Sequence, residues 1–135
     1  MAKIKANEAL VKALQAWDID HLYGIPGDSI DAVVDSLRTV RDQFKFYHVR
    51  HEEVASLAAG SYTKMTGKIG VALSIGGPGL VHLLNGMCDA KMDKVPQLIL
   101  SGQTNSTLLG TKAVQDTNLS KLCEDVAVYY HLIQK

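Results

Sequence analysis

Apolar residues recur along the chain at two spacings, one typical of helices and the other of strands. Leu10, Val11 and Leu14 fall at helical spacing and predict an amphipathic helix near the start of the chain. Further helices are predicted after Asp28, over 52–65, from Leu80 to Met87 and over 119–123. Strands are predicted over 21–25, 44–49, 69–75, 95–100 and 126–133. The polar segment 103–117 is predicted to be a long loop.

Strand and helix alternate throughout, which predicts an α/β fold with an open, mostly parallel sheet and helices on both faces, in three layers. No repeat or linker interrupts the pattern, so a single domain over 1–135 is expected. In such sheets ligands bind beyond the carboxyl ends of the strands. Four turns are therefore expected to meet at one rim, and they are Pro26-Gly27, His51-Glu52, Gly76 to Gly79 and Ser101-Gly102.

Charge and hydropathy exclude several classes of function. Fourteen basic residues balance fourteen acidic ones, so a role on nucleic acid or at a membrane surface has no electrostatic support. No apolar run approaches the roughly 20 residues that span a bilayer, and no signal stretch opens the chain, so a cytoplasmic protein is expected. Cys88 and Cys123 form no CxxC unit and are expected to be buried free thiols.

The Gly76 to Gly79 turn invites a phosphate-binding interpretation but lacks the details that one requires. It is not a GxxxxGK[ST] loop, and the sequence after it lacks the third glycine of the dinucleotide fingerprint. A plain strand-to-helix turn is the favoured interpretation. The turn could still hold a neutral, flat ligand against its backbone.

The histidines near residue 50 do not predict a metal site. Residues three apart on a strand point to opposite faces, so His48 and His51 are not expected to chelate one ion together. No histidine follows Glu52 at the spacing of the zinc-protease helix motif. We expect no metal here.

Glu52 is the strongest candidate for chemistry. It lies where a strand gives way to an alanine-rich helix, at the expected rim. Glutamates are common in first helical turns because their negative charge is favourable at the positive end of the helix dipole. A purely structural role of this kind for Glu52 stays open. The apolar residues that follow, among them Val54, Ala55 and Leu57, suggest a setting in which a carboxyl group holds its proton more readily.

Four blocks in this order carry a family resemblance, and they are 23–28, 50–53, 77–86 and 95–103. From about Lys3 to Ile133 the chain resembles the N-terminal pyrimidine-binding domain of thiamine diphosphate enzymes. It resembles the pyruvate oxidases more than the acetolactate synthases and related decarboxylases. The resemblance implies the thiamine diphosphate-binding fold.

The resemblance implies that Glu52 hydrogen-bonds a ring nitrogen of the cofactor's aminopyrimidine. The shared proton would help the exocyclic nitrogen to take the proton from the thiazolium carbon, which then attacks the keto carbon of a 2-oxo acid. Pro26, Gly27, Pro78 and His82 are implied to surround the pyrimidine.

The resemblance also implies roles for two further residues, Gln115 and Asp28, and leaves alternatives open for each. Gln115 matches a family glutamine near the substrate, although Val114 and Asp116 depart from the family's Phe and Glu on either side of it. Asp28 matches an aspartate used for proton relay in decarboxylases. Asp28 or Ser29 could equally cap the following helix, since both residue types are favoured caps.

The resemblance implies the pyrimidine-binding half of a pyruvate oxidase, which activates thiamine diphosphate for oxidative decarboxylation of pyruvate. Magnesium and FAD are expected to be bound by the middle and diphosphate-binding domains, which are missing from 1–135, so the isolated chain is expected to be inactive. A homo-oligomer, as a dimer of this domain, is expected. The alternatives are the same domain of an acetolactate synthase, or a stand-alone non-catalytic module.

Overall fold

The computed structural model describes residues 3–133 and contains a four-stranded sheet in which every pair of neighbouring strands is parallel. The strand order is β2-β1-β3-β4. The strands are β1 (His21–Gly24), β2 (Lys45–His48), β3 (Gly70–Ser74) and β4 (Gln97–Ser101). In register, Gly24 lies opposite His48 on one side and Leu73 on the other, so the carboxyl ends of β1, β2 and β3 align.

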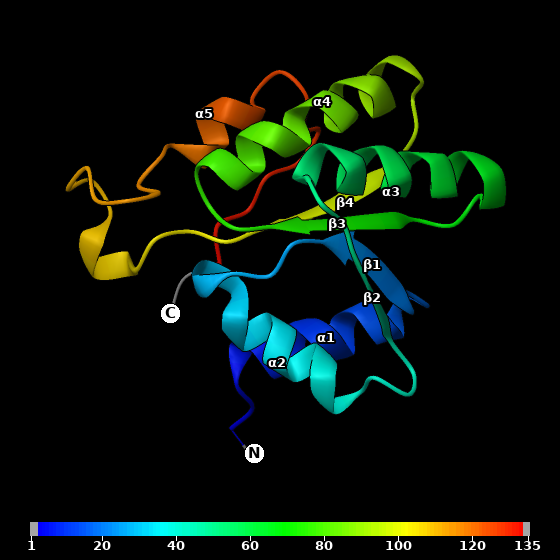
Figure 1. The fold of residues 1–135 in the computed structure, drawn as a ribbon, viewed down its shortest axis with the longest axis horizontal. Helices are drawn as coiled ribbons and strands as arrows, with labels where there is room; N and C mark the ends of the chain where they lie inside the picture. The colour runs from blue at the N-terminus through cyan, green and yellow to red at the C-terminus, as the bar shows by residue number, and fades with distance from the viewer. Residues whose placement is uncertain (1–2, 134–135) are drawn as a thin grey trace.

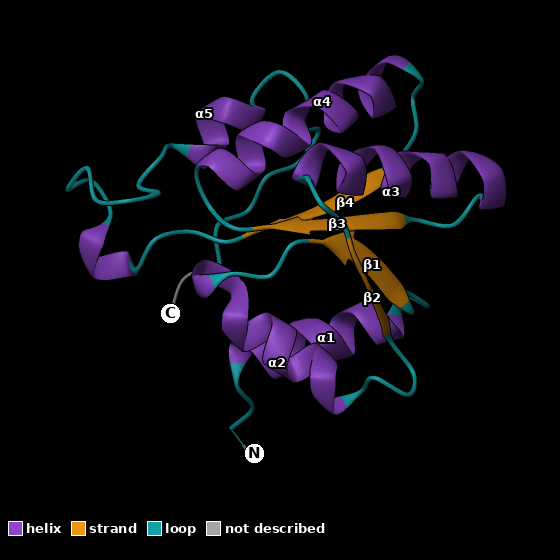
Figure 2. Cartoon of the chain, viewed as in Figure 1, coloured by secondary structure: helices purple, strands orange, loops and turns teal. Residues whose placement is uncertain are grey.

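Helices cover both faces of this sheet (Figure 1). One face carries α1 (Ala6–Ala16) and α2 (Asp31–Thr39), and the other carries α3 (Glu52–Thr66) and α4 (Pro78–Met92). The short α5 (Leu119–Cys123) packs beside α4. Figure 2 shows the strands as a single layer between the two helical layers. The predicted three-layer α/β fold is confirmed.

The central strand β3 divides the core into two clusters. Val71 and Leu73 pack with residues of α1 and α2, whereas Ala72 packs with Ala55 and Ala59 of α3 and with α4. All five residues of β3 are buried, as expected of a strand covered on both faces. The small side chains between α3 and β3 let the two backbones approach closely: a Cβ on Gly70 would lie 2.0 Å from the carbonyl oxygen of Ala59.

The predicted strand over 126–133 is wrong, because this segment has no strand structure. A strand needs a neighbour for its backbone hydrogen bonds, and no described strand pairs with this segment. Its side chains are largely exposed, with Val128, Tyr129 and Ile133 among them. β-forming residues alone did not fix its conformation.

The start of α2 also differs from the prediction that Asp28 or Ser29 caps it. Asp28–Ile30 forms a 3₁₀ turn (η1), and Ile30 occupies the N-cap position of α2. No side chain caps the start of η1 or the start of α2. The hydroxyl of Ser29 instead accepts a hydrogen bond from the amide of Gly76, at 3.0 Å. Ser29 therefore ties two rim turns together.

The remaining expectations about single segments have mixed outcomes. The long loop after β4 is confirmed, with one 3₁₀ turn at Ser106–Leu108. Both cysteines are free, but only Cys123 is buried, whereas Cys88 is exposed on α4. Among residues 3–133, no helix has the length and apolar character required to cross a membrane.

Candidate functional site

The turns that follow β1, β3 and β4 pack against one another at the carboxyl edge of the sheet. A Cβ on Gly27 would lie 2.5 Å from a methyl group of Ile75, and one on Gly102 would lie 2.3 Å from the hydroxyl of Ser29. Side chains larger than hydrogen do not fit at either position without movement. The expected rim therefore forms, and small residues make it possible.

Glu52 lies on this rim as the first residue of α3, and it is only 8 % exposed. Its Oε2 atom lies 2.9 Å from Nδ1 of His82, which comes from the second turn of α4. The tautomer of His82 that carries a proton on Nδ1 donates this hydrogen bond to the carboxyl oxygen. No hydrogen bond joins the other oxygen, Oε1, to a described residue, and the side chain keeps 11 % of its surface exposed, so the carboxyl group has capacity for one more contact.

Close packing of α3 against α4 brings Glu52 and His82 together. A Cβ on Gly86 would lie 2.6 Å from the backbone nitrogen of Leu57, so the glycine lets the helices approach. The side chain of Asn85 donates a hydrogen bond to Glu53, at 3.1 Å, and fixes the same two helices. A proline opens α4, at a position where its missing N–H costs nothing.

His51 adds a second imidazole to this pair. It is the cap residue of α3, with Nδ1 accepting from the amide of Glu53 at 3.4 Å. Its ring lies 4.4 Å from the ring of His82, measured between centroids. One potential ligand atom each from His51, Glu52 and His82 lies within 4.8 Å of the others. From the sequence, His51 is considered only with His48, which ends β2, and that pair is rejected. His82 is expected at the pyrimidine through the family resemblance, but its contacts with Glu52 and His51 are not predicted, because they arise between two helices.

Gln115 lies against the glycine turn. Gly77 has a φ of 60°, which favours glycine, and a Cβ there would lie 3.0 Å from Cα of Gln115. Gln115 itself has a φ of 66°, and the side chain of Gln103 donates to the carbonyl of Thr117 at 3.1 Å. These contacts hold part of the long loop at the rim, next to the exposed Pro78.

The structure leaves Asp28 and Pro26 exposed on the turn after β1. The Asp28 carboxylate makes no hydrogen bond to any described residue, and it caps no helix. Glu52 contacts His82, and Gln115 lies against Gly77, but no hydrogen bond among the described residues joins Asp28 to either pair.

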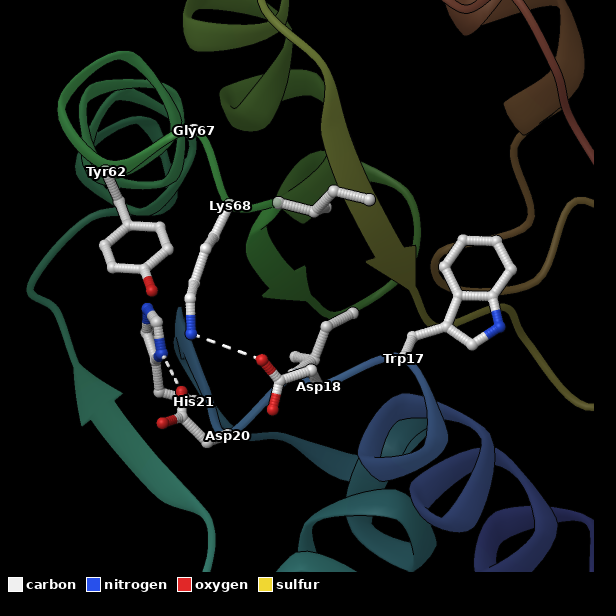
Figure 3. A pocket seen from close by; sticks show the side chains of 9 residues that line it. Trp17, Asp18, Asp20, His21, Tyr62, Gly67 and Lys68 are labelled. Carbon is white, nitrogen blue, oxygen red and sulfur yellow. Dashed lines mark hydrogen bonds and ion pairs between the residues drawn. The ribbon is translucent and has the colours of Figure 1, made fainter.

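A hollow of about 220 Å³ lies at the opposite edge, by the amino ends of β1 and β3 (Figure 3). Its charged groups pair with each other: Lys68 with Asp18 at 3.2 Å, and His21 with Asp20 at 2.6 Å. These hydrogen bonds raise the pKa of Lys68 and lower the pKa of Asp20. Nε2 of His21 is buried and offers the hollow no accessible atom. We assign no ligand to it.

An open parallel sheet with convergent loops at its carboxyl edge defines a ligand-binding α/β domain. The family model for the N-terminal TPP binding domain of thiamine pyrophosphate enzymes matches residues 4–122. The chain therefore belongs to this family, whose cofactor is also called thiamine diphosphate.

Three relatives are similar over nearly the whole chain. YdaP of Bacillus subtilis, named as a thiamine pyrophosphate-containing protein, is 52 % identical over 96 % of the chain. A pyruvate oxidase of Lactiplantibacillus plantarum is 47 % identical over 93 %, and an acetolactate synthase of Mycobacterium leprae is 32 % identical over 98 %. The matches cover 22 %, 21 % and 21 % of these proteins, so the chain spans about one fifth of their length.

Proposed function

We propose that this chain is the pyrimidine-binding part of a pyruvate oxidase, in which Glu52 is the acid-base group. The observation that supports this proposal most directly concerns the Glu52 carboxyl group. It is buried at the rim, His82 holds one of its oxygens, and the other oxygen has no partner among residues 3–133. A group so placed can share a proton with a ligand atom at Oε1 while His82 keeps its orientation.

The residues present suit an aminopyrimidine. Such a ring is flat and neutral, and it offers a ring nitrogen that a carboxyl group can hydrogen-bond. Thiamine diphosphate, when bound, supplies the electron sink for loss of carbon dioxide from a 2-oxo acid. Glu52 would hold the proton at the ring nitrogen, and His82 would position Glu52. Pro26, Gly27 and Pro78 would line the ring, since they stand at the rim with little side chain to obstruct it.

Asp28 and Gln115 are proposed to act on the substrate side. Asp28 is exposed, caps no helix and makes no hydrogen bond to a described residue, so its carboxylate is available to relay protons. Gln115 is held against Gly77 and could hydrogen-bond a substrate oxygen. Magnesium and FAD would be bound away from this site, because the 135 residues contain no Gly-Asp-Gly sequence to hold a diphosphate and its metal.

Pyruvate is the proposed substrate, and a cytoplasmic homo-oligomer is the proposed assembly. Identity is higher to the pyruvate oxidase, at 47 %, than to the acetolactate synthase, at 32 %, which favours the oxidase. Exposed apolar side chains on α3 and α4, such as Val54, Leu57 and Val81, support association of this domain with another copy. Acetolactate synthesis remains the second candidate, and a non-catalytic module the third.

The test is the product formed by the complete enzyme, in which this domain works with its diphosphate-binding counterpart. With thiamine diphosphate, magnesium and FAD, we expect pyruvate to release carbon dioxide only while an electron acceptor is present. Acetolactate formed without an acceptor would favour the synthase. No turnover of pyruvate under either condition would favour the non-catalytic module.

A further inference from the structure

His51, Glu52 and His82 form a cluster whose composition differs from that of an ordinary rim. Two imidazoles and one carboxylate are ligands that Zn²⁺ and related transition metals prefer. The three side chains come from the first turn of α3 and the second turn of α4, which the close helix contact holds together. Their ligand atoms already lie within 4.8 Å of one another.

The spacing needs little adjustment to hold an ion. Bonds of about 2.0–2.2 Å place the ligand atoms of a tetrahedral zinc site roughly 3.4 Å apart. Glu52 and His82 approach to 2.9 Å already. The side chain of His51 is 48 % exposed and held only by its long cap hydrogen bond of 3.4 Å, so a rotation of the remaining ångström or so meets little resistance.

Charge around the cluster is also compatible with a cation. The amino end of α3 alone would repel one, because the helix dipole is positive there. Two carboxylates in that first turn, Glu52 and Glu53, oppose the dipole. Glu53 lies 3.8 Å from Nδ1 of His51, close enough to add to the field.

We propose that His51, Glu52 and His82 form a binding site for a divalent transition metal of the Zn²⁺ type, with a fourth position open to water. This site is unrelated to the magnesium that a diphosphate would require. One consequence of this site rests on the proposed function. A bound zinc ion and a pyrimidine compete, because both need the Glu52 carboxylate. Zinc would then inhibit the enzyme at its pyrimidine site.

The experiment titrates Zn²⁺ into the 135-residue chain by calorimetry and records the visible absorption of Co²⁺ as a reporter of coordination. A Cys88→Ser background removes the exposed thiol, which is itself a zinc ligand. His51→Asn deletes one imidazole but keeps a side chain favoured at a helix cap. His82→Asn deletes the other, and His48→Asn is the matched control on β2.

We expect one zinc ion per chain, with affinity lowered at least ~10-fold by His51→Asn and by His82→Asn and unchanged by His48→Asn. Absence of zinc binding, or equal affinity in His51→Asn, would overturn the site. Thiamine, which carries the pyrimidine without a chelating diphosphate, is the competitor: zinc should weaken its binding to the wild type and not to His51→Asn. Zinc binding in a chain that takes up no thiamine would support the metal site and contradict the proposed function. Thiamine binding without zinc binding would contradict the metal site and support the proposed function.

Discussion

At the scale of single residues, the site depends on how one buried carboxyl group is held. Burying Glu52 is unfavourable unless its oxygens find partners, and His82 satisfies one of them at 2.9 Å. The other oxygen keeps its hydrogen-bonding capacity for a ligand. Loss of the imidazole at position 82 would therefore free the carboxyl group to turn, without removing the acid-base group itself.

Asp28→Asn in the complete enzyme is expected to slow turnover by roughly 100-fold or more, the contribution of a positioned proton-transfer group. Proton exchange at the thiazolium carbon should keep its wild-type rate, because we propose that Glu52, and not Asp28, promotes that step. The measurements are steady-state turnover and exchange followed by NMR.

Asp31→Asn serves as the control for Asp28→Asn, since Asp31 is also an exposed acidic residue in the first turn of its helix. Because Asp28 makes no hydrogen bond to a described residue, both variants should unfold within about 0.5 kcal/mol of the wild type. Unchanged turnover in Asp28→Asn would show that the residue has no part in proton transfer.

Some of these site residues could be predicted from the sequence and others could not. Glu52 could be found because it begins an alanine-rich helix directly after a strand, at an edge where ligands bind. His51 could not be assigned to the same cluster, because its neighbour His82 is 31 positions away in the chain and meets it only across two helices. The predicted cap at Asp28 or Ser29 is wrong because a 3₁₀ turn, which the sequence pattern does not reveal, comes before α2.

At the scale of elements, periodicity was a good guide wherever an element has a packing partner. β3 was predicted within one residue at each end, since its apolar run is bounded by glycines and buried on both faces. The segment 126–133 has similar β-forming residues but no neighbouring strand, and it stays irregular. Local preference is decisive only where tertiary contacts agree with it.

Gly86→Ala tests the helix pair that carries the site. Alanine normally favours a helix over glycine by about 1 kcal/mol. Here its Cβ would lie 2.6 Å from the backbone nitrogen of Leu57, and α3 and α4 would have to separate. We expect a loss of about 1–3 kcal/mol in the free energy of unfolding, measured with denaturant, because overpacking then outweighs propensity.

Cys88→Ala is the control for Gly86→Ala, because Cys88 is exposed on the same helix. It should change the free energy of unfolding by no more than about 0.5 kcal/mol. Gly86→Ala with wild-type stability would show that α3 and α4 do not pack as closely as described.

At the scale of the whole molecule, the rim presents only part of what thiamine diphosphate needs. In the proposed function the residues at the carboxyl edge hold only the neutral pyrimidine, and the chain spans about one fifth of the length of its relatives. The sequence contains no GxxxxGK[ST] loop to hold a diphosphate. Under the proposed function, positioning of the thiazolium ring would then depend on groups beyond this site.

The 135-residue chain alone is therefore expected to bind thiamine diphosphate weakly and almost independently of magnesium, and to release no carbon dioxide from pyruvate. Loss of positioning can remove several kcal/mol of barrier lowering, roughly 7–11 kcal/mol at the most. Calorimetric titration with and without magnesium measures the binding, and a carbon dioxide assay measures turnover. Tight magnesium-dependent binding would reveal a diphosphate site within these residues.

The central claim is that Glu52 activates the cofactor, and exchange of the thiazolium proton for deuterium measures that step directly. Glu52→Gln keeps an oxygen that can accept from His82 but cannot share a proton with the pyrimidine nitrogen. Glu53→Gln is the matched control, one residue along the same helical turn. In the complete enzyme we expect Glu52→Gln to slow exchange by roughly 100- to 10,000-fold and Glu53→Gln to leave it unchanged. Exchange at the wild-type rate in Glu52→Gln would contradict the account.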